Sequence, residues 1–413
     1  MNIIDAHNMN NLFELSGDGN TLLSVKDKSA IRVVVPEGVT SVSYCAFAYC
    51  NCLQSVVFPD SLVSIGDCAF HDCSMLRSIE LSSNMSFIGN NAFYGCLSLE
   101  SIDVAPDNKL FSSSDGVLYN KEFTRMICFP SNHKDKDFFI PVSVKIIGTG
   151  AFSGRSSLKE LYIPDSVTTI EAAAFYNNSS LNHIEIPDTI THIGEYAFYN
   201  CSSLQTVHIP SDVTSIEKAT FYNCASLKSV IIPAGVKNIG IEAFRYCRCL
   251  QFVDIPASVE CVDWLAFANC PSLKNVNVAV GNQKYTSVNG VLYDKDLTVI
   301  YHFPQNSDLK EITLHNSIVS IYHYAFCNCM RLQAIDIPER VTFIGANAFK
   351  CCRNLKSIII RCRDIEALNV DKRAFNGVDF DECILSVRSE LFTKYRNHPV
   401  FGKFSNIMAE DFV

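Results

Sequence analysis

Hydrophobic positions return along this chain at a fixed spacing of 23 residues. Leucine stands six residues after a recurring phenylalanine, and apolar residues follow at nine and eleven, as in Val207 and Ile209. A proline then ends this alternating stretch in most repeats, which predicts a short strand because proline has no N–H to donate. The phenylalanine, preceded by alanine or threonine, occurs at Phe47, Phe70, Phe93, Phe152, Phe175, Phe198, Phe221, Phe244, Phe267, Phe326 and Phe349.

A single repeat of this kind has too few apolar side chains to offset its own ordering entropy. Past the proline, apolar residues such as Val213 and Ile216 return three apart, and a short segment carrying the phenylalanine closes the turn. Stacked repeats bury each apolar column against its neighbours, with strands in a parallel sheet about 4.8 Å apart. The pattern therefore predicts a solenoid.

The repeat L-x-x-[IV]-x-IP-x-x-[VI]-x-x-I-G-x-x-AF-x-x-C resembles the BspA-like (Treponema-type) leucine-rich repeat over about residues 31–361. The resemblance implies a leucine-rich-repeat solenoid: a right-handed, β-dominated α/β superhelix with one parallel strand per repeat and short or 3-10 helical returns. Proteins of this family are described as surface-exposed, and some bind host extracellular-matrix proteins or other cells. The identity of a ligand does not transfer with the fold.

Two gaps of 59 residues interrupt the rhythm, and each equals one normal step plus 36. They contain the similar stretches DGVLYNKEFTRMICFP and NGVLYDKDLTVIYHFP, in which a G-V-L-Y strand, an Asn/Asp-Lys turn and a second apolar strand predict a hairpin. We expect enlarged repeats near 105–140 and 279–314. A wider repeat that continues the sheet is favoured over a dedicated binding loop.

The two ends of the chain depart from the repeat, and we expect each to cap the core. Residues 1–30 predict a hairpin around Gly17 to Asn20. Residues 362–413 form an irregular last repeat and C-terminal cap that resembles the closing element of gut-bacterial members of the family. Tyr395, Phe401 and Phe404 are available there to cover the last repeat, since an exposed core face would aggregate.

Net charge and the absence of hydrophobic targeting segments limit the kinds of partner and the cellular locations that we expect. The net charge of −9 and pI near 5.6 argue against a nucleic-acid binder, which needs a basic face. The sequence predicts no membrane span and shows no export signal at its start. The family resemblance implies a cell-surface or secreted protein, and because no export signal is visible, a cytoplasmic location is the alternative.

Nineteen cysteines raise the question of whether they bind metal, form disulfides or pack in the core. No C-x-x-C pair occurs, and nine cysteines share the position three residues after the phenylalanine. Each has equivalent neighbours in the repeats above and below, which disfavours unique disulfide pairs. We interpret this column as structural, with cysteine as a small hydrophobe and weak S–H donor in a tight turn that Asn178 also fills.

Candidate functional residues lie eight and ten positions after the phenylalanine, where side chains point away from the core. Aromatic or aliphatic residues here indicate either a protein-docking patch or lateral packing across the sheet. His183, Glu185 and His208 could approach a metal ion, but a stack of solvated polar residues is favoured because the column has no fourth ligand. Our candidate partner-binding residues are Tyr162, His183, Glu185, His208, Ile231, Phe252 and Asp254.

Other features of the sequence do not indicate catalysis. Glu185 and Asp254 lie about 14 Å apart by strand count, too far for a carboxylate pair, and no nucleophile elbow, P-loop or HExxH motif occurs. The recurring Tyr94, Tyr176 and Tyr199 are interpreted as edge packing, as is Tyr222.

We therefore expect a non-enzymatic, monomeric module without cofactors that binds a protein or glycan. An intracellular scaffold is the alternative, supported by the cysteines, whose thiols persist most readily in reducing compartments. A hydrolase acting on surface polymers is the remote alternative, disfavoured because no catalytic constellation is evident.

Overall fold

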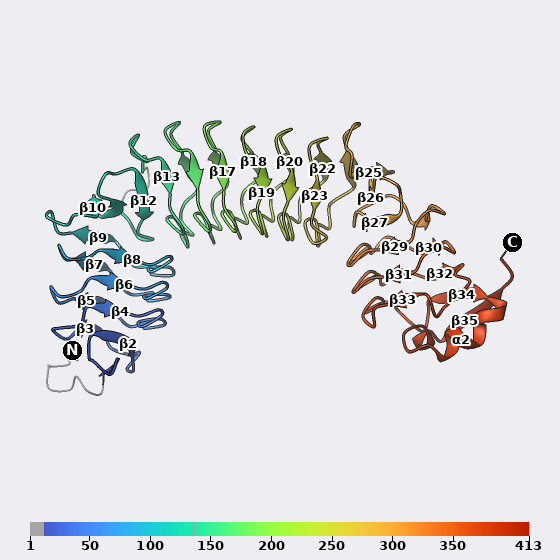
Figure 1. Ribbon diagram of the computed structural model, residues 1–413, viewed down its shortest axis with the longest axis horizontal. Helices are drawn as coiled ribbons and strands as arrows, with labels where there is room; N and C mark the ends of the chain where they lie inside the picture. The colour runs from blue at the N-terminus through green and yellow to red at the C-terminus, as the bar shows by residue number, and fades with distance from the viewer. Residues whose placement is uncertain (1–11, 135–137, 413) are drawn as a thin grey trace. The chain divides into compact units, whose positions relative to one another are not determined.

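The computed structural model describes residues 12–134 and 138–412, and these fall into two compact units, residues 1–204 and 205–413. Residues 1–11 of the predicted N-terminal cap lie outside the described residues. In each unit, short strands from successive repeats lie side by side (Figure 1). Each unit is thus a β-solenoid, as the 23-residue period predicts.

Each regular repeat contributes a first strand of three or four residues, followed in most repeats by the proline, and then a second strand of two residues. In the first unit, the first strands are β3 (Arg32–Val34), β5 (Ser55–Val57), β7 (Ser78–Leu81), β9 (Ser101–Val104), β14 (Glu160–Tyr162) and β16 (His183–Glu185). The second strands are β4 (Ser41–Val42), β6 (Ser64–Ile65), β8 (Phe87–Ile88), β13 (Ile146–Ile147), β15 (Thr169–Ile170) and β17 (His192–Ile193).

The second unit repeats this arrangement. Its first strands are β18 (Thr206–His208), β20 (Ser229–Ile231), β22 (Phe252–Ile255), β24 (Asn275–Val278), β28 (Glu311–Thr313), β30 (Ala334–Ile337) and β32 (Ser357–Ile360). Its second strands are β19 (Ser215–Ile216), β21 (Asn238–Ile239), β23 (Cys261–Val262), β29 (Ser320–Ile321), β31 (Phe343–Ile344) and β33 (Asn369–Val370). Neighbouring strands pair in parallel and in register, residue for residue across one repeat, as in Val207 with Val230.

The core of each unit is a stack of phenylalanine rings. The rings of Phe152, Phe175 and Phe198 lie nearly parallel, with centroids 5.2 and 5.1 Å apart, and all three side chains are fully buried. Phe221, Phe244 and Phe267 stack in the same way in the second unit. Leucine, valine and isoleucine columns pack around these rings, so every repeat covers the apolar face of the next.

The segment that carries each phenylalanine leads back from the second strand to the first strand of the next repeat, and we call it the return. The returns are successive turns, whereas the family resemblance allowed either short returns or 3-10 helical ones. The residues two before and two after the phenylalanine have positive φ in most repeats, as at Ala173 (55°) and Asn177 (60°). A residue in this left-handed region cannot continue a right-handed helix. Asn, Asp and Gly are frequent after the phenylalanine because they tolerate this conformation best.

The cysteine column is structural, as expected. The Cys201 thiol donates a hydrogen bond to the Phe175 carbonyl of the preceding repeat at 3.2 Å, and Asn178 donates from Nδ2 to the Phe152 carbonyl at 3.0 Å. Burial raises the pKa of the Cys270 thiol to about 12, which keeps it protonated as a donor. The same bond is made at 2.9–3.6 Å by Cys73, Cys96, Cys247, Cys270, Cys329 and Cys352.

Each enlarged repeat contains three antiparallel strands before it rejoins the parallel sheet. They are β10 (Phe111–Ser114), β11 (Val117–Asn120) and β12 (Arg125–Cys128), then β25 (Tyr285–Val288), β26 (Val291–Asp294) and β27 (Val299–His302). The predicted hairpin is confirmed as β11–β12 and β26–β27. The strand before it was missed, although Asp115-Gly116 and Asn289-Gly290, all with positive φ, are typical of a type I′ turn. Because β12 pairs in parallel with β13 and β27 with β29, each insertion continues the sheet.

Atypical elements lie at both ends of the described residues. At the N-terminal end, β1 (Phe13–Leu15) and β2 (Thr21–Val25) pair antiparallel, and β2 joins β4. At the C-terminal end are β34 (Ile384–Arg388), η2 (Ser389–Leu391), α2 (Phe392–Asn397), η3 (Phe401–Lys403) and β35 (Asn406–Glu410). The buried rings of Phe401 and Phe404 lie against Phe375, and Tyr395 packs on Phe401. We propose that 1–30 and 362–413 are the two caps.

We predict that Cys201→Ala lowers the free energy of unfolding by about 1–2 kcal/mol, because it removes a buried thiol and its hydrogen bond to Phe175. The control Cys249→Ala changes an exposed cysteine two repeats further along the chain and is expected to have little effect. Urea unfolding measures both. An equal loss in the two variants would show that the column contributes nothing specific.

Stability should also depend on His302, at the end of β27. Burial lowers the pKa of this imidazole to about 4 from the ordinary value of 6.5. The unfolded chain therefore takes up the proton first as pH falls, and the free energy of unfolding declines between pH 6.5 and pH 4, by at most about 3 kcal/mol.

His302→Leu should flatten this part of the stability–pH curve, whereas His192→Leu, at an exposed position, should not. Denaturant midpoints measured at half-unit pH steps test this. The assignment is wrong if wild type and His302→Leu lose stability in parallel as the pH falls.

Candidate functional site

The predicted outward positions on the first strands do face away from the core. In the first unit, Tyr162 is 53% exposed on β14, and Glu185 lies directly across from it on β16. His183 Nε2 lies 3.7 Å from Glu185 Oε1 on the same strand. The structure therefore brings Tyr162, His183 and Glu185 together on one solvated sheet surface.

The remaining four candidates lie together in the second unit. His208, Ile231 and Asp254 are aligned across β18, β20 and β22, and Phe252 is the diagonal neighbour of Ile231. Ile231 is 75% exposed and Phe252 is 42% exposed. The Asn277 amide donates to the Asp254 carboxylate at 2.8 Å. We call the surface of Ile231 and Phe252 with His208 and Asp254 the apolar sheet patch.

The candidates are thus divided between the two units. The approach of His208 to His183 and Glu185 stays a prediction, and so does the partner-binding role of all seven residues. Within residues 12–134 and 138–412, no group of three His, Cys, Asp or Glu side chains is arranged to hold a metal ion. Over the same residues, no helix has the length and apolar character needed to cross a bilayer.

Sequence reasoning missed a groove on the return edge of the first unit. Aromatic rings follow one another along this edge from Tyr49 to His71 and Tyr94, with centroids 5.5 and 5.0 Å apart. Tyr94 then meets Tyr176 edge-on at 5.8 Å, and Tyr176 stacks on Tyr199 at 4.6 Å. The expected edge packing of the tyrosines is confirmed, but between Tyr94 and Tyr176 it spans a return without an aromatic side chain.

The interruption arises from the first enlarged repeat. The returns of the Phe93 and Phe152 repeats are in direct contact, since a Cβ added to Gly150 would lie 2.0 Å from Asn91 Oδ1. The Phe152 return carries Ser153 where both neighbouring repeats have tyrosine, and Gly154 where the following repeat has asparagine. These small residues leave a notch, and the Tyr94 ring lies across it.

Tyr94 divides this notch into two hollows, of about 560 and 550 Å³. We call them together the tyrosine groove. One hollow is lined by Cys68, His71, Asp72, Asn91, Tyr94, Ala173, Tyr176 and Tyr196. The other is lined by Tyr49, Asn51, Asp72, Ser74, Tyr94, Gly95, Leu97, Gly154, Ser156 and Asn177.

Hydrogen bonds fix the middle of the groove. Asn177 Nδ2 donates to the Tyr94 hydroxyl at 2.6 Å, and Asn200 Nδ2 donates to Asn177 Oδ1 at 2.8 Å. Burial raises the pKa of the Tyr94 phenol, although the Asn177 bond opposes this shift. Asp72 Oδ2 lies 3.1 Å from His71 Nδ1. The groove thus combines aromatic rings with one carboxylate and several amides.

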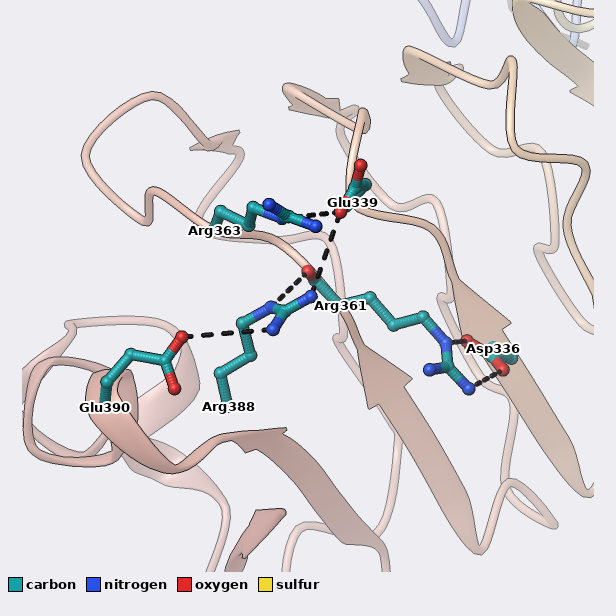
Figure 2. A network of polar contacts seen from close by, with 6 residues as sticks. All are labelled: Asp336, Glu339, Arg361, Arg363, Arg388 and Glu390. Atoms are coloured by element: carbon teal, nitrogen blue, oxygen red, sulfur yellow. Dashed lines mark hydrogen bonds and ion pairs between the residues drawn. The ribbon is translucent and has the colours of Figure 1, made fainter. Parts of the chain in front are cut away.

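A charged cluster on the last repeats joins the array to the C-terminal elements (Figure 2). Arg361 forms a bidentate pair with Asp336 at 2.8 and 2.9 Å, and this hydrogen bonding raises the pKa of the guanidinium. The largely buried Arg388 donates to the Arg361 carbonyl at 3.0 Å. The cluster also contains Glu339, Arg363 and Glu390. Every arginine drawn in Figure 2 has a carboxylate partner. We infer that the cluster fastens β34 and the elements after it to the array.

Comparison with known proteins agrees with this architecture. A family model described as BspA type leucine rich repeat region (6 copies) matches residues 26–135, 122–248, 169–288 and 297–395. The fold is therefore that of a leucine-rich-repeat solenoid. The chain belongs to the BspA-type leucine-rich-repeat family.

Solved structures of bacterial proteins are also similar to this chain. A leucine-rich repeat protein from Eubacterium ventriosum is 21% identical, with 84% of this chain and 76% of that chain covered and a TM-score of 0.44. One from Bacteroides ovatus is 22% identical, with 89% and 87% covered and a TM-score of 0.43. A leucine rich cell surface protein from Faecalibacterium prausnitzii is 19% identical, with 97% and 93% covered and a TM-score of 0.41. No curated protein matches the sequence.

Proposed function

We propose that this protein is a non-catalytic binding module that docks a protein partner on the apolar sheet patch of its second unit. The observation that carries the proposal is the exposure of Ile231 and Phe252 on neighbouring strands, 75% and 42%. Interface energy concentrates in a few apolar or aromatic side chains surrounded by polar ones. His208 and Asp254 supply that polar surround on the flanking positions.

The parallel sheet also holds these side chains in fixed positions before a partner binds. Parallel pairing in register holds Ile231 and Phe252 on strands whose inward residues, Val230 and Val253, are buried in the core. A partner therefore meets a preorganised surface and loses little free energy in ordering it. Tyr162 offers a similar exposed ring in the first unit. Membership of the BspA-type family supports adhesion at a cell surface, with an extracellular-matrix or cell-surface protein as the partner.

An intracellular scaffold is the second candidate, because the nineteen cysteines, all within the described residues, form no disulfide. Brief protease treatment of intact cells separates the two. A surface protein is degraded while a cytoplasmic marker survives, whereas an intracellular scaffold is cleaved only after lysis.

We predict that the double variant Ile231→Ser, Phe252→Ser weakens binding to a protein partner at least about tenfold, the effect of losing a small hot spot. Binding to a panel of immobilised extracellular-matrix proteins, including collagen and laminin, is measured by surface plasmon resonance. The matched control is Val142→Ser, Val280→Ser, which removes two exposed apolar side chains outside the patch. The proposal fails if no protein binds, or if the patch variant and the control bind equally.

A further inference from the structure

We propose that the tyrosine groove of the first unit is a binding site for a neutral oligosaccharide. It shares no residue with the apolar sheet patch, so this inference does not rest on the proposed function. Both hollows fall within the range of about 300–1,000 Å³ typical of small-ligand sites. Their walls contain the two kinds of group that a sugar ring requires.

The first kind of group is an aromatic surface. A pyranose has C–H groups on its ring faces, and these pack against the electron-rich face of a tyrosine. Tyr49 is 59% exposed at one end of the groove, and Tyr94 and Tyr176 are partly exposed in its middle. The aromatic edge extends over several repeats, which suits a chain of sugars better than a single ring.

The second kind is a set of acceptors and donors for hydroxyl groups. The Asp72 carboxylate lies between the two hollows and lines both of them. A carboxylate accepts hydrogen bonds from two adjacent hydroxyls, and an amide such as that of Asn51 both donates and accepts. Gly95 allows this arrangement, since a Cβ there would lie 2.0 Å from Asp72 Oδ1.

Charge argues that the ligand is neutral. Among the lining residues, all within the described part of the chain, there is no lysine or arginine. Asp72 would repel a sulfated or carboxylated sugar, and the neighbouring His71 is the one cationic side chain available when it is protonated. Phosphorylated and anionic ligands are thereby disfavoured.

Backbone hydrogen bonding argues against an extended peptide. Along this edge the returns bond to one another, as in Asp72 N–H to the Tyr94 carbonyl at 2.8 Å and Gly154 N–H to the Tyr176 carbonyl at 2.7 Å. A peptide that adds to a sheet needs unpaired backbone groups on the edge strand. A ligand in the groove must therefore be recognised by side chains.

The second enlarged repeat shows that the insertion alone does not create such a groove. There Ala268 takes the place of Tyr94, and Trp264 stacks over Tyr324 at 5.3 Å. Asn328 Nδ2 donates directly to Asn269 Oδ1 at 2.5 Å across the two returns. The groove therefore depends on Tyr94, which the corresponding return before the second insertion lacks.

The test uses the full chain and a panel of neutral hexasaccharides: cellohexaose, maltohexaose, laminarihexaose, mannohexaose and the N-acetylglucosamine hexamer. Saturation-transfer NMR detects binding, and calorimetry measures its affinity. We expect at least one hexasaccharide to bind. Tyr94→Ala and Asp72→Asn should each weaken that binding about tenfold, the effect of one ring contact or one charge-assisted hydrogen bond.

Matched control variants distinguish the loss of a ligand contact from a general loss of folding. Tyr222→Ala changes the same repeat position in the second unit and should leave the affinity unchanged. If Tyr94→Ala does not fold, Asp72→Asn and the exposed Tyr49→Ala carry the test. The inference is overturned if no hexasaccharide binds, if these variants bind as wild type does, or if a peptide competes for the groove.

The apolar-patch variant Ile231→Ser, Phe252→Ser should bind the hexasaccharide normally. Failure of this inference therefore leaves the proposed protein docking intact, and failure of protein docking leaves the groove intact.

Discussion

Every other feature of this protein depends on the contact of one phenylalanine ring with the next, one repeat away. Each repeat is too short to bury its own side chains, so its stability comes from the faces it shares with its neighbours. Two left-handed residues flank the ring and turn the chain sharply at fixed points, as Ala173 and Asn177 do around Phe175. In most repeats the cysteine three residues after the ring then donates a hydrogen bond to the previous repeat, as Cys201 does, and Asn178 does the same in its repeat.

The same constraint explains where a groove can form. The first enlarged repeat supplies Phe129 to the stack, with its ring 5.3 Å from Phe152, but it adds its extra residues as antiparallel strands. The returns on either side are consequently in contact, and small residues at Ser153 and Gly154 open a notch between the aromatic residues. A surface feature thus follows from a change in repeat length that leaves the core intact.

The fold was predictable because its signal recurs at one period. Spacing alone located the first strands and the outward direction of Tyr162 and Ile231. The strand β10 was missed because it contains Phe111-Ser-Ser-Ser, a weak strand pattern, although Asp115-Gly116 marks its end. The tyrosine groove was not predictable in the same way, since Tyr94 and Asn177 are 83 residues apart and meet only across the insertion. Ser153 was the available signal, because it replaces the tyrosine that both neighbouring repeats have at this position.

The most direct test of this account is hydrogen exchange in wild type and Phe175→Ala, a substitution that removes about 3–5 kcal/mol of core packing. If neighbouring rings stabilise one another, protection is lost chiefly in the repeats of Phe152, Phe175 and Phe198, whose rings are in contact. The repeats of Phe326 and Phe349 should retain their protection. An equal loss of protection in all repeats would contradict the account.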